Sequence, residues 1–308
     1  MNTKRCLYEL LVRAVLLPAV FLFSCGCSSL VFADDLRIVW DNNDGDLLFT
    51  NPNNWGHVTL PIANNTLPGT FVDSGDTTNA IIQNGDSVNL TSNFTAANQF
   101  DILIVRFNSS LNISADLNTA NSPILVGQIA GATDAITQTA GTVSASSLSI
   151  GDGGGDAAVT YSMSGGALNL SGNLSMTNDS ATSLLSLQGD SASITVGSNF
   201  AMNTGSTLSM QFGSGGVDAI DVAGTFTVDP SAMLEVDGSA YTGGPGIIDL
   251  VKFSNITGAF AEPANVSLTG FSSPVSLGYD SDSLFLSVSG RSLALFVLVI
   301  ILHNFCGL

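Results

Sequence analysis

Pairs of apolar residues, each separated by one polar or small residue, recur along the middle of the chain at an interval of 26 residues. Alternate side chains of a β-strand face the same way, so each pair predicts a short strand with one buried face. The pairs of this first set are Leu148/Ile150, Leu174/Met176, Phe200/Met202 and Phe226/Val228. A fixed period of this length is typical of a solenoid, in which each repeat forms one coil stacked on the previous one.

A second set of apolar pairs lies six residues upstream of the first and keeps the same interval. Its pairs are Leu168/Leu170, Ile194/Val196 and Ile220/Val222. Small turn-forming tripeptides separate the two sets, and they read Ser171-Gly172-Asn173, Gly197-Ser198-Asn199 and Ala223-Gly224-Thr225. We therefore expect neighbouring coils to superimpose strand on strand and turn on turn, with short Ser, Thr and Asn side chains facing outward.

Stacking is required because the few inward side chains of one coil cannot offset the conformational entropy lost when its backbone is ordered. The register is less regular outside the best repeats. Val143 is one residue out of step, and Leu208/Met210 match Leu234/Val236 at the regular interval but not the preceding coil. An antiparallel sandwich with evenly spaced strands is the alternative. We favour an all-β right-handed parallel β-helix (β-solenoid) with coils of about 26 residues, capped at both ends.

The composition agrees with a turn-rich β-protein, because glycine, serine, threonine and asparagine dominate and helical periodicity is absent outside the two ends. All acidic residues except Glu9 lie in 34–290, where Arg37, Arg106 and Lys252 are the only basic residues, so that span has a formal charge of −21. This excess argues against binding to nucleic acid or to an anionic membrane surface. We attribute it to solubility of a repetitive β-protein rather than to an acidic binding patch.

Residues 1–33 are typical of a signal peptide. Basic residues precede an apolar core, Ala14–Phe23, and Val31-Phe32-Ala33 supplies a cleavage site before Asp34. Lipidation at Cys25 is an alternative, although the bulky Phe23 departs from the usual lipobox. The sequence therefore predicts a secreted or cell-surface protein. All four cysteines lie near the two ends of the chain, so no disulfide framework is expected in the body.

The C-terminal segment, 291–308, contains ten consecutive apolar residues, Leu293–Leu302. Ten residues of helix span only ~15 Å, about half of a ~30 Å hydrocarbon core. The segment is consistent with a short anchor, a processed sorting signal or a hydrophobic cap on the solenoid. Membrane association through 293–302 therefore stays open.

Between these ends we divide the body into an N-terminal entry or cap region, 34–78, the solenoid repeats, 79–252, and a C-terminal β cap, 253–290. The entry region contains both tryptophans, Trp40 and Trp55. We expect these residues to cover the open apolar end of the stack. The alternative is a carbohydrate-binding module in which Trp40 and Trp55 stack on sugar rings.

Several phrases of the body resemble those of one family. They are Trp40-Asp41-Asn42, Asn51-Pro52-Asn53-Asn54-Trp55, Asp73–Thr77, Ala80–Ile82, Gln138–Val143, Ser164–Leu168, Gly197–Phe200, Ile248–Phe253 and Thr257–Phe260. In these phrases, residues 38–290 resemble bacterial secreted proteins with autotransporter-associated β-strand repeats. The resemblance implies a right-handed parallel β-helix at or beyond the cell surface. We expect a passenger-like protein without a translocator barrel, because too few residues follow residue 290 to form one.

Parallel β-helices include polysaccharide lyases and hydrolases, so catalysis has to be considered. A lyase needs a lysine or arginine base beside carboxylates, and a hydrolase needs two suitably separated carboxylates. The repeats 137–251 contain no basic residue, and Asp218 and Asp221 flank Ile220, which favours solvated positions on the outer face. We therefore expect no catalytic residues. A lyase dependent on Arg106 and Lys252, or a hydrolase, is retained as the second alternative.

Two acidic segments resemble calcium loops without meeting their rules. In Asp41–Asp46, placing Gly45 at the sixth loop position makes Trp40 the first ligand, which cannot bind calcium. Gly151–Asp156 approaches the nonapeptide calcium repeat, but Asp152 replaces a required glycine and no second copy follows. We expect no cofactor and no dedicated metal site, and leave opportunistic calcium binding open.

The sequence thus predicts an exported, non-enzymatic β-solenoid with a structural or adhesive role at the cell surface or outside the cell. Its expected partners are extracellular polysaccharide or other cell-surface components, and not nucleic acid.

Overall fold

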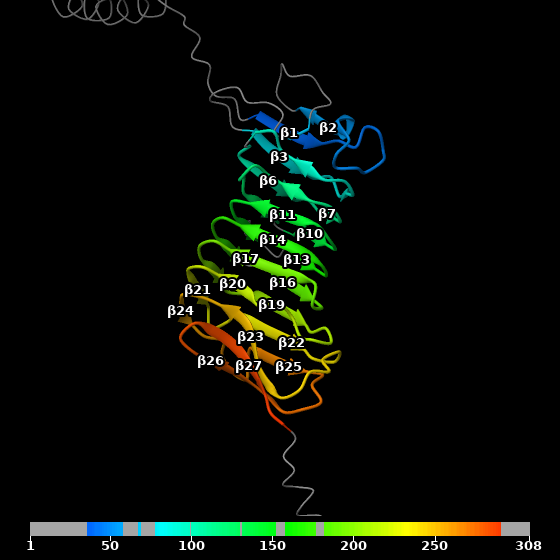
Figure 1. The fold of residues 1–308 in the computed structure, drawn as a ribbon. Helices are drawn as coiled ribbons and strands as arrows, with labels where there is room; N and C mark the ends of the chain where they lie inside the picture. The colour runs from blue at the N-terminus through cyan, green and yellow to red at the C-terminus, as the bar shows by residue number, and fades with distance from the viewer. Residues whose placement is uncertain are drawn as a thin grey trace, which may run out of the picture. The chain divides into compact units, whose positions relative to one another are not determined.

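The computed structural model describes residues 36–57, 67–68, 78–98, 100–129, 131–151, 158–176 and 182–290. Within these ranges the chain forms 27 strands and one short 3-10 helix, η1 (Pro52–Asn54). The strands form three mainly parallel sheets that build a β-solenoid, as predicted (Figure 1). The predicted signal peptide, Cys25 and the C-terminal tail at 291–308 lie outside the described residues.

Each coil contributes one strand to each of three sheets. The first sheet has the order β2 (Trp55–His57), β1 (Leu36–Trp40), β3 (Thr78–Ile82), β6 (Ile102–Val105), β9 (Ile124–Val126), β12 (Leu148–Ile150), β15 (Leu174–Met176), β18 (Phe200–Met202), β21 (Thr225–Val228) and β24 (Asn255–Gly258). The second sheet has the order β25 (Val266–Thr269), β22 (Met233–Asp237), β19 (Ser206–Gln211), β16 (Thr182–Gln188), β13 (Ala158–Met163), β10 (Thr133–Gln138), β7 (Ser110–Ile113) and β4 (Ser87–Leu90). The third sheet has the order β26 (Val275–Tyr279), β27 (Ser283–Val288), β23 (Gly246–Lys252), β20 (Ile220–Val222), β17 (Ala192–Val196), β14 (Gly166–Leu170), β11 (Thr142–Ala145), β8 (Leu117–Asn118) and β5 (Phe94–Thr95).

The regularly spaced pairs align as the sequence predicts. Leu148 is paired with Leu174, Leu174 with Phe200 and Phe200 with Phe226, all between parallel strands of the first sheet. The Phe200 and Phe226 rings are fully buried, with centroids 5.1 Å apart. Because these neighbouring copies run in the same direction, the antiparallel-sandwich alternative is wrong.

Coil length varies while strand register is kept. Val143 is paired with Leu168, and Leu185 with Leu208, both at intervals shorter than the regular repeat. The apparent slips in the sequence therefore lie in the turns, where residues are added or lost. The strands themselves align inward residue on inward residue, so the apolar column stays continuous.

The turn from the third sheet to the first is stacked as closely as the strands are. The Gly172 N–H donates to Ser146 O at 2.6 Å, and the Ser198 N–H donates to Gly172 O at 3.1 Å. A Cβ on Gly172 would lie 2.7 Å from Ser146 O, so the turn accepts only glycine there. The Asn199 N–H donates to Asn173 Oδ1 at 3.1 Å, which adds a side-chain rung to this ladder.

The N-terminal end of the apolar column is covered by aromatic rings. Strand β1 pairs in parallel with β3, and β2 pairs antiparallel with β1, bringing Trp40 opposite Trp55. The Trp40 and Trp55 centroids lie 5.2 Å apart in a T-shaped arrangement, and Phe49 packs on Trp55 at 5.1 Å. The predicted entry region, 34–78, thus already contains a strand of the first sheet.

The C-terminal end changes strand direction. The first and second sheets gain one more parallel strand each, β24 and β25, beyond the predicted repeat boundary at residue 252. In the third sheet, β23 instead pairs antiparallel with β27, which forms a hairpin with β26. Phe253 and Phe260 are buried beneath this closure. The described residues therefore carry a cap at both ends of the parallel stack.

The acidic side chain of Asp134, in β10, is fully buried beneath the second sheet. Its Oδ1 accepts a hydrogen bond from the Ser109 N–H at 3.0 Å, whereas its Oδ2 has no hydrogen-bond partner. Burial raises the pKa of the Asp134 carboxyl, because the charged form loses hydration, although backbone N–H donors oppose the shift. The native state therefore favours the protonated carboxyl relative to the unfolded chain.

We predict that Phe200→Ala lowers the free energy of unfolding by about 3–5 kcal/mol, because it removes a ring from the buried column and leaves a cavity. Chemical denaturation followed by circular dichroism measures the change. Thr227→Ala, on the outward side of the neighbouring strand β21, is the control and should change the stability by less than about 0.5 kcal/mol. Equal losses for both variants would contradict the stacked core.

We predict that Asp134→Asn stabilises the protein at neutral pH by ~1 kcal/mol, because it removes a charge that is buried without full hydrogen bonding. A raised native pKa means that the penalty is absent below the unfolded-state value of about 3.9 and grows as the pH rises through the native pKa. Unfolding curves at several pH values should thus converge in acid. Asp218→Asn, at an exposed site, is the control and should change the stability at neutral pH by less than about 0.5 kcal/mol.

Candidate functional site

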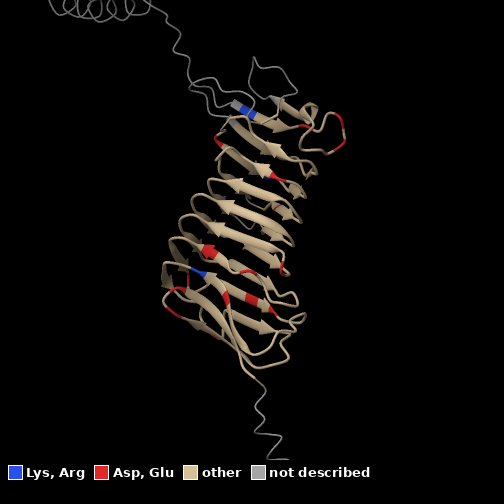
Figure 2. Ribbon diagram, in the orientation of Figure 1, with Lys and Arg blue, Asp and Glu red and all other residues tan. Residues whose placement is uncertain are grey.

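One hollow lies on the outer side of the third sheet, near the C-terminal cap. It has a volume of about 470 Å³ and is formed by the ends of β17, β20 and β23, the start of β27, and the turn before β27. Its charged lining residues are Asp221, Asp249, Lys252, Asp280 and Asp282. Figure 2 shows that charged residues are sparse on the strands of the middle coils and more frequent near this end.

Strand register brings these side chains together. Thr195 is paired with Asp221, Asp221 with Lys252, and Lys252 with Ser283. These four residues therefore form one column across four strands of the third sheet. The inward neighbours Val196, Val222 and Val251 are buried, and this fixes the column on the outer face.

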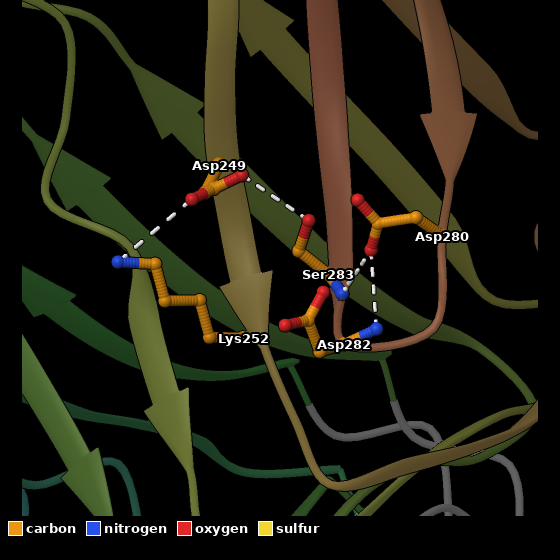
Figure 3. Close-up of polar contacts among 5 residues, drawn as sticks. All are labelled: Asp249, Lys252, Asp280, Asp282 and Ser283. Carbon is orange, nitrogen blue, oxygen red and sulfur yellow. Dashed lines mark hydrogen bonds and ion pairs between the residues drawn. The ribbon is translucent and has the colours of Figure 1, made fainter.

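Lys252, Asp249 and Ser283 are linked to one another (Figure 3). The Lys252 Nζ lies 3.8 Å from Asp249 Oδ2, and the Ser283 Oγ donates to Asp249 Oδ1 at 3.1 Å. The two charged side chains are 54% and 37% exposed, so this ion pair contributes little to stability. The ion pair places the Lys252 ammonium group beside the Asp249 carboxylate in the lining of the hollow.

Asp280 and Asp282 belong to the turn between β26 and β27. The N–H groups of Asp282 and Ser283 donate to Asp280 Oδ1 at 3.1 Å and 2.6 Å. These backbone donors lower the pKa of Asp280, because they stabilise its charged form. The pKa of Asp282 is raised, first by a hydrogen bond with the Asp280 side chain and then by the negative charge of Asp280.

A second hollow of about 370 Å³ lies on the same face, over earlier coils. It is lined by Asn118, Asn121, Ser144, Ala145, Asn169, Leu170 and Ser171. Its lining contains no charged group, so its polar chemistry consists of amides and hydroxyls. The Ser171 Oγ donates to Asn121 Oδ1 at 2.7 Å, although the two residues are 50 positions apart in the chain.

The interpretation of Trp40 and Trp55 as a sugar-stacking surface is corrected by their burial. Both rings are 0% exposed and belong to the main apolar core. The Trp55 Nε1 donates to Phe49 O at 2.8 Å, so even its polar atom is used internally. Neither ring offers a face to a ligand, and their position at the end of the first sheet agrees with the capping interpretation.

The two basic residues considered for a lyase are not brought together. Arg106 follows β6 of the first sheet, where its guanidinium donates to Gln83 Oε1 and to Gln128 Oε1, the latter at 2.9 Å. Lys252 ends β23 of the third sheet, among the carboxylates of the hollow. Asp218 and Asp221 are both exposed, as expected, but only Asp221 lines the hollow.

The acidic loop after β1 is held by internal hydrogen bonds. Asp44 Oδ2 accepts from the side-chain amides of Asn51 and Asn53, and Asp46 Oδ2 accepts from Asn51 at 2.7 Å. Among the described residues, no three histidine, cysteine or acidic side chains converge in a way that suits a metal ion. Most of the other calcium-like segment, Gly151–Asp156, lies outside the described residues, so the possibility of opportunistic calcium binding there is not tested.

Sequence reasoning missed the carboxylate–lysine hollow. Asp249 and Lys252 are close in the chain, but the interval from Asp221 to its paired residue Lys252 is longer than the regular repeat. Asp280 and Asp282 join them only through the antiparallel turn, which no period predicts. The sequence offered no distinctive signal, because the span 218–290 is no denser in acidic residues than the span 34–86. The assembled carboxylates and the Ser283 hydroxyl can bind cationic or hydroxylated ligands.

No protein-family model, curated protein or solved structure matches this chain. Within the part of the chain that the structure describes, no helix has the length and apolar character needed to cross a membrane.

We predict that Asp280→Asn lowers the pKa of Asp282 toward the ordinary aspartate range, because it removes the carboxylate whose hydrogen bond and negative charge both disfavour ionisation of Asp282. The oxygen of the introduced amide would still accept the turn hydrogen bonds. Carboxyl ¹³C NMR titration measures the pKa directly. Asp218→Asn removes the same charge outside the hollow and should leave the Asp282 titration unchanged, whereas an unaltered pKa in Asp280→Asn would rule out the coupling.

Proposed function

We propose that this chain is an exported, non-enzymatic β-solenoid with a structural and adhesive role at the cell surface or in the extracellular space. The observation that carries the proposal is the register-locked stack, which repeats the same short polar side chains along its lateral faces. A stack of this kind supplies spacing and many similar contacts rather than a single enclosed site.

The outer face of the second sheet illustrates this repetition. Its strands present mainly Ser, Thr and Asn between the buried residues, and neighbouring coils link these side chains. The Asn112 Nδ2 donates to Asn89 Oδ1 at 3.0 Å, and the Ser110 Oγ donates to Ser87 Oγ at 2.9 Å. The same side chains can each make a weak contact with an external ligand. When a polymer or a cell surface presents matching groups along the face, these contacts add up by multivalency.

Export is proposed from the sequence alone. The segment 1–33 has the pattern of a signal peptide, and residues 38–290 resemble the passenger-like proteins with autotransporter-associated β-strand repeats. The large negative charge of the body supports solubility and opposes edge-to-edge association outside the cell. Whether the protein is released or retained at the cell surface would depend on the tail at 291–308 or, alternatively, on lipidation at Cys25.

A polysaccharide lyase remains the second candidate because Lys252 lies 3.8 Å from Asp249 in an open hollow. Four carboxylates line that hollow with the single lysine, so an acidic sugar would meet net repulsion there. The geometry therefore supports binding better than lyase chemistry. A hydrolase could use Asp280 and Asp282 only if a glycosidic bond reached the turn between β26 and β27.

We predict that latex beads coated with the full chain, purified from an exporting host, adhere to bacterial cells or to immobilised extracellular polysaccharide. Intact-mass measurement of the preparation should give a first residue of Asp34. Bead retention under flow measures adhesion. The double variant Phe200→Ala/Phe226→Ala, which disrupts the stacked core, should lose adhesion, while Thr227→Ala should keep it. Failure of the parent protein to adhere to any surface in the panel would remove the adhesive role.

A further inference from the structure

The two hollows on the third sheet lie over adjacent strands, and we call the surface that they cover together the outer groove of the third sheet. The hollow of about 370 Å³ ends at Asn169, Leu170 and Ser171, and the hollow of about 470 Å³ begins at Thr195, Val196 and Gly197. Asn169 is paired with Thr195, and Leu170 with Val196, on adjacent hydrogen-bonded strands. No strand separates the two hollows, so both lie over the same ends of the third-sheet strands.

The length of the groove follows from the strands it crosses. It runs over β8, β11, β14, β17, β20, β23 and β27, which are neighbours in the third sheet. At the usual strand spacing of about 4.7–4.9 Å, these seven strands give a groove of roughly 29 Å. Asn121 lies at one end and the Asp280–Asp282 turn at the other. A groove of this length fits an extended chain of several units better than a single small molecule.

The two halves of the groove differ in chemistry. The half near Asn121 carries amides and hydroxyls, which donate to and accept from ligand hydroxyls. The half near the C-terminal cap has four carboxylates and one lysine, a net formal charge of −3 when all are ionised. That half attracts a cationic group. A polyanion would be repelled there, and the groove lies on a sheet face, so it offers no free strand edge for a peptide to extend.

We propose that the outer groove of the third sheet binds an extended glycan that carries free amino groups, with hydroxyls along the amide-lined half and protonated amines at Asp221, Asp249 and Asp280. This inference rests on the proposed adhesive function, for which it names the ligand class and the contact surface. The repeat of the groove is one strand spacing per coil, close to the length of one pyranose in an extended chain, so successive sugars meet successive coils.

The test uses the full chain and a β-1,4-linked glucosamine oligomer, with calorimetry at mildly acidic pH and low salt. The N-acetylated oligomer of equal length, an oligogalacturonate and an oligolysine peptide are the comparison probes. We expect the glucosamine oligomer to bind more tightly than the other three. Tighter or equal binding of oligolysine would indicate that the ligand is a cationic peptide and would overturn the proposal. Equal affinity for the N-acetylated oligomer or for the oligogalacturonate would also overturn it.

Two matched pairs of variants locate the site. Asp221→Asn/Asp249→Asn should weaken binding of the glucosamine oligomer by about tenfold, since each exposed charge contact accounts for up to roughly fivefold. Asp190→Asn/Asp218→Asn removes the same charge from exposed sites outside the groove and should change little. Equal effects of the two double variants would show a non-specific charge effect and overturn the site.

In the uncharged half, Asn169→Ala should weaken binding by roughly threefold, the value of about one neutral hydrogen bond. Asn112→Ala, on the outer face of the second sheet, is the control and should bind as the parent does. Bead adhesion separates the two proposals. If adhesion persists while no oligomer binds, the groove proposal is overturned and the proposed function is kept. If the oligomer binds without adhesion, the groove proposal is kept and the adhesive function is overturned.

Discussion

The parallel hydrogen-bond ladder between successive coils is the constraint on which the rest of this molecule depends. Parallel pairing aligns each strand with its counterpart in the next coil, so the inward residues of one coil lie directly over those of another. The ladder thereby turns isolated pairs such as Phe200/Met202 into a continuous apolar column. No single coil buries enough surface to stand alone, and cooperation between neighbours supplies the stability.

The same alignment reaches the turns and the surface. In the turn from the third sheet to the first, the Gly172 N–H donates to Ser146 O at 2.6 Å, and this close approach leaves no room for a side chain at position 172. On the outer side, whatever one coil presents is set beside what the next coil presents. Asp221, Lys252 and Ser283 lie in one column for this reason, although they are far apart in the chain.

The sequence was sufficient to predict what depends on periodicity and insufficient for what depends on the irregular parts. The regular interval predicted the architecture, the parallel register of Leu174 with Phe200, and the small stacked turns. It could not show that shorter coils keep the same register, because the changes in length lie in turns. The carboxylate–lysine hollow escaped prediction since it needs a longer coil and the reversal of strand direction at β27. Burial of Trp40 and Trp55 was foreseen as capping, while their sugar-contact alternative depended on exposure that the folded chain denies them.

Because register is stored in the strands and length differences are absorbed at the corners, the number of coils is separable from the fold. Removing or duplicating one complete winding in the regular part joins segments whose inward positions still coincide, whereas a one-residue insertion within a strand would turn its inward side chains outward. Evolution can therefore alter reach in whole steps of one winding while leaving both end closures untouched. The length of such a molecule can therefore change by whole coils during evolution, independently of how its ends are closed.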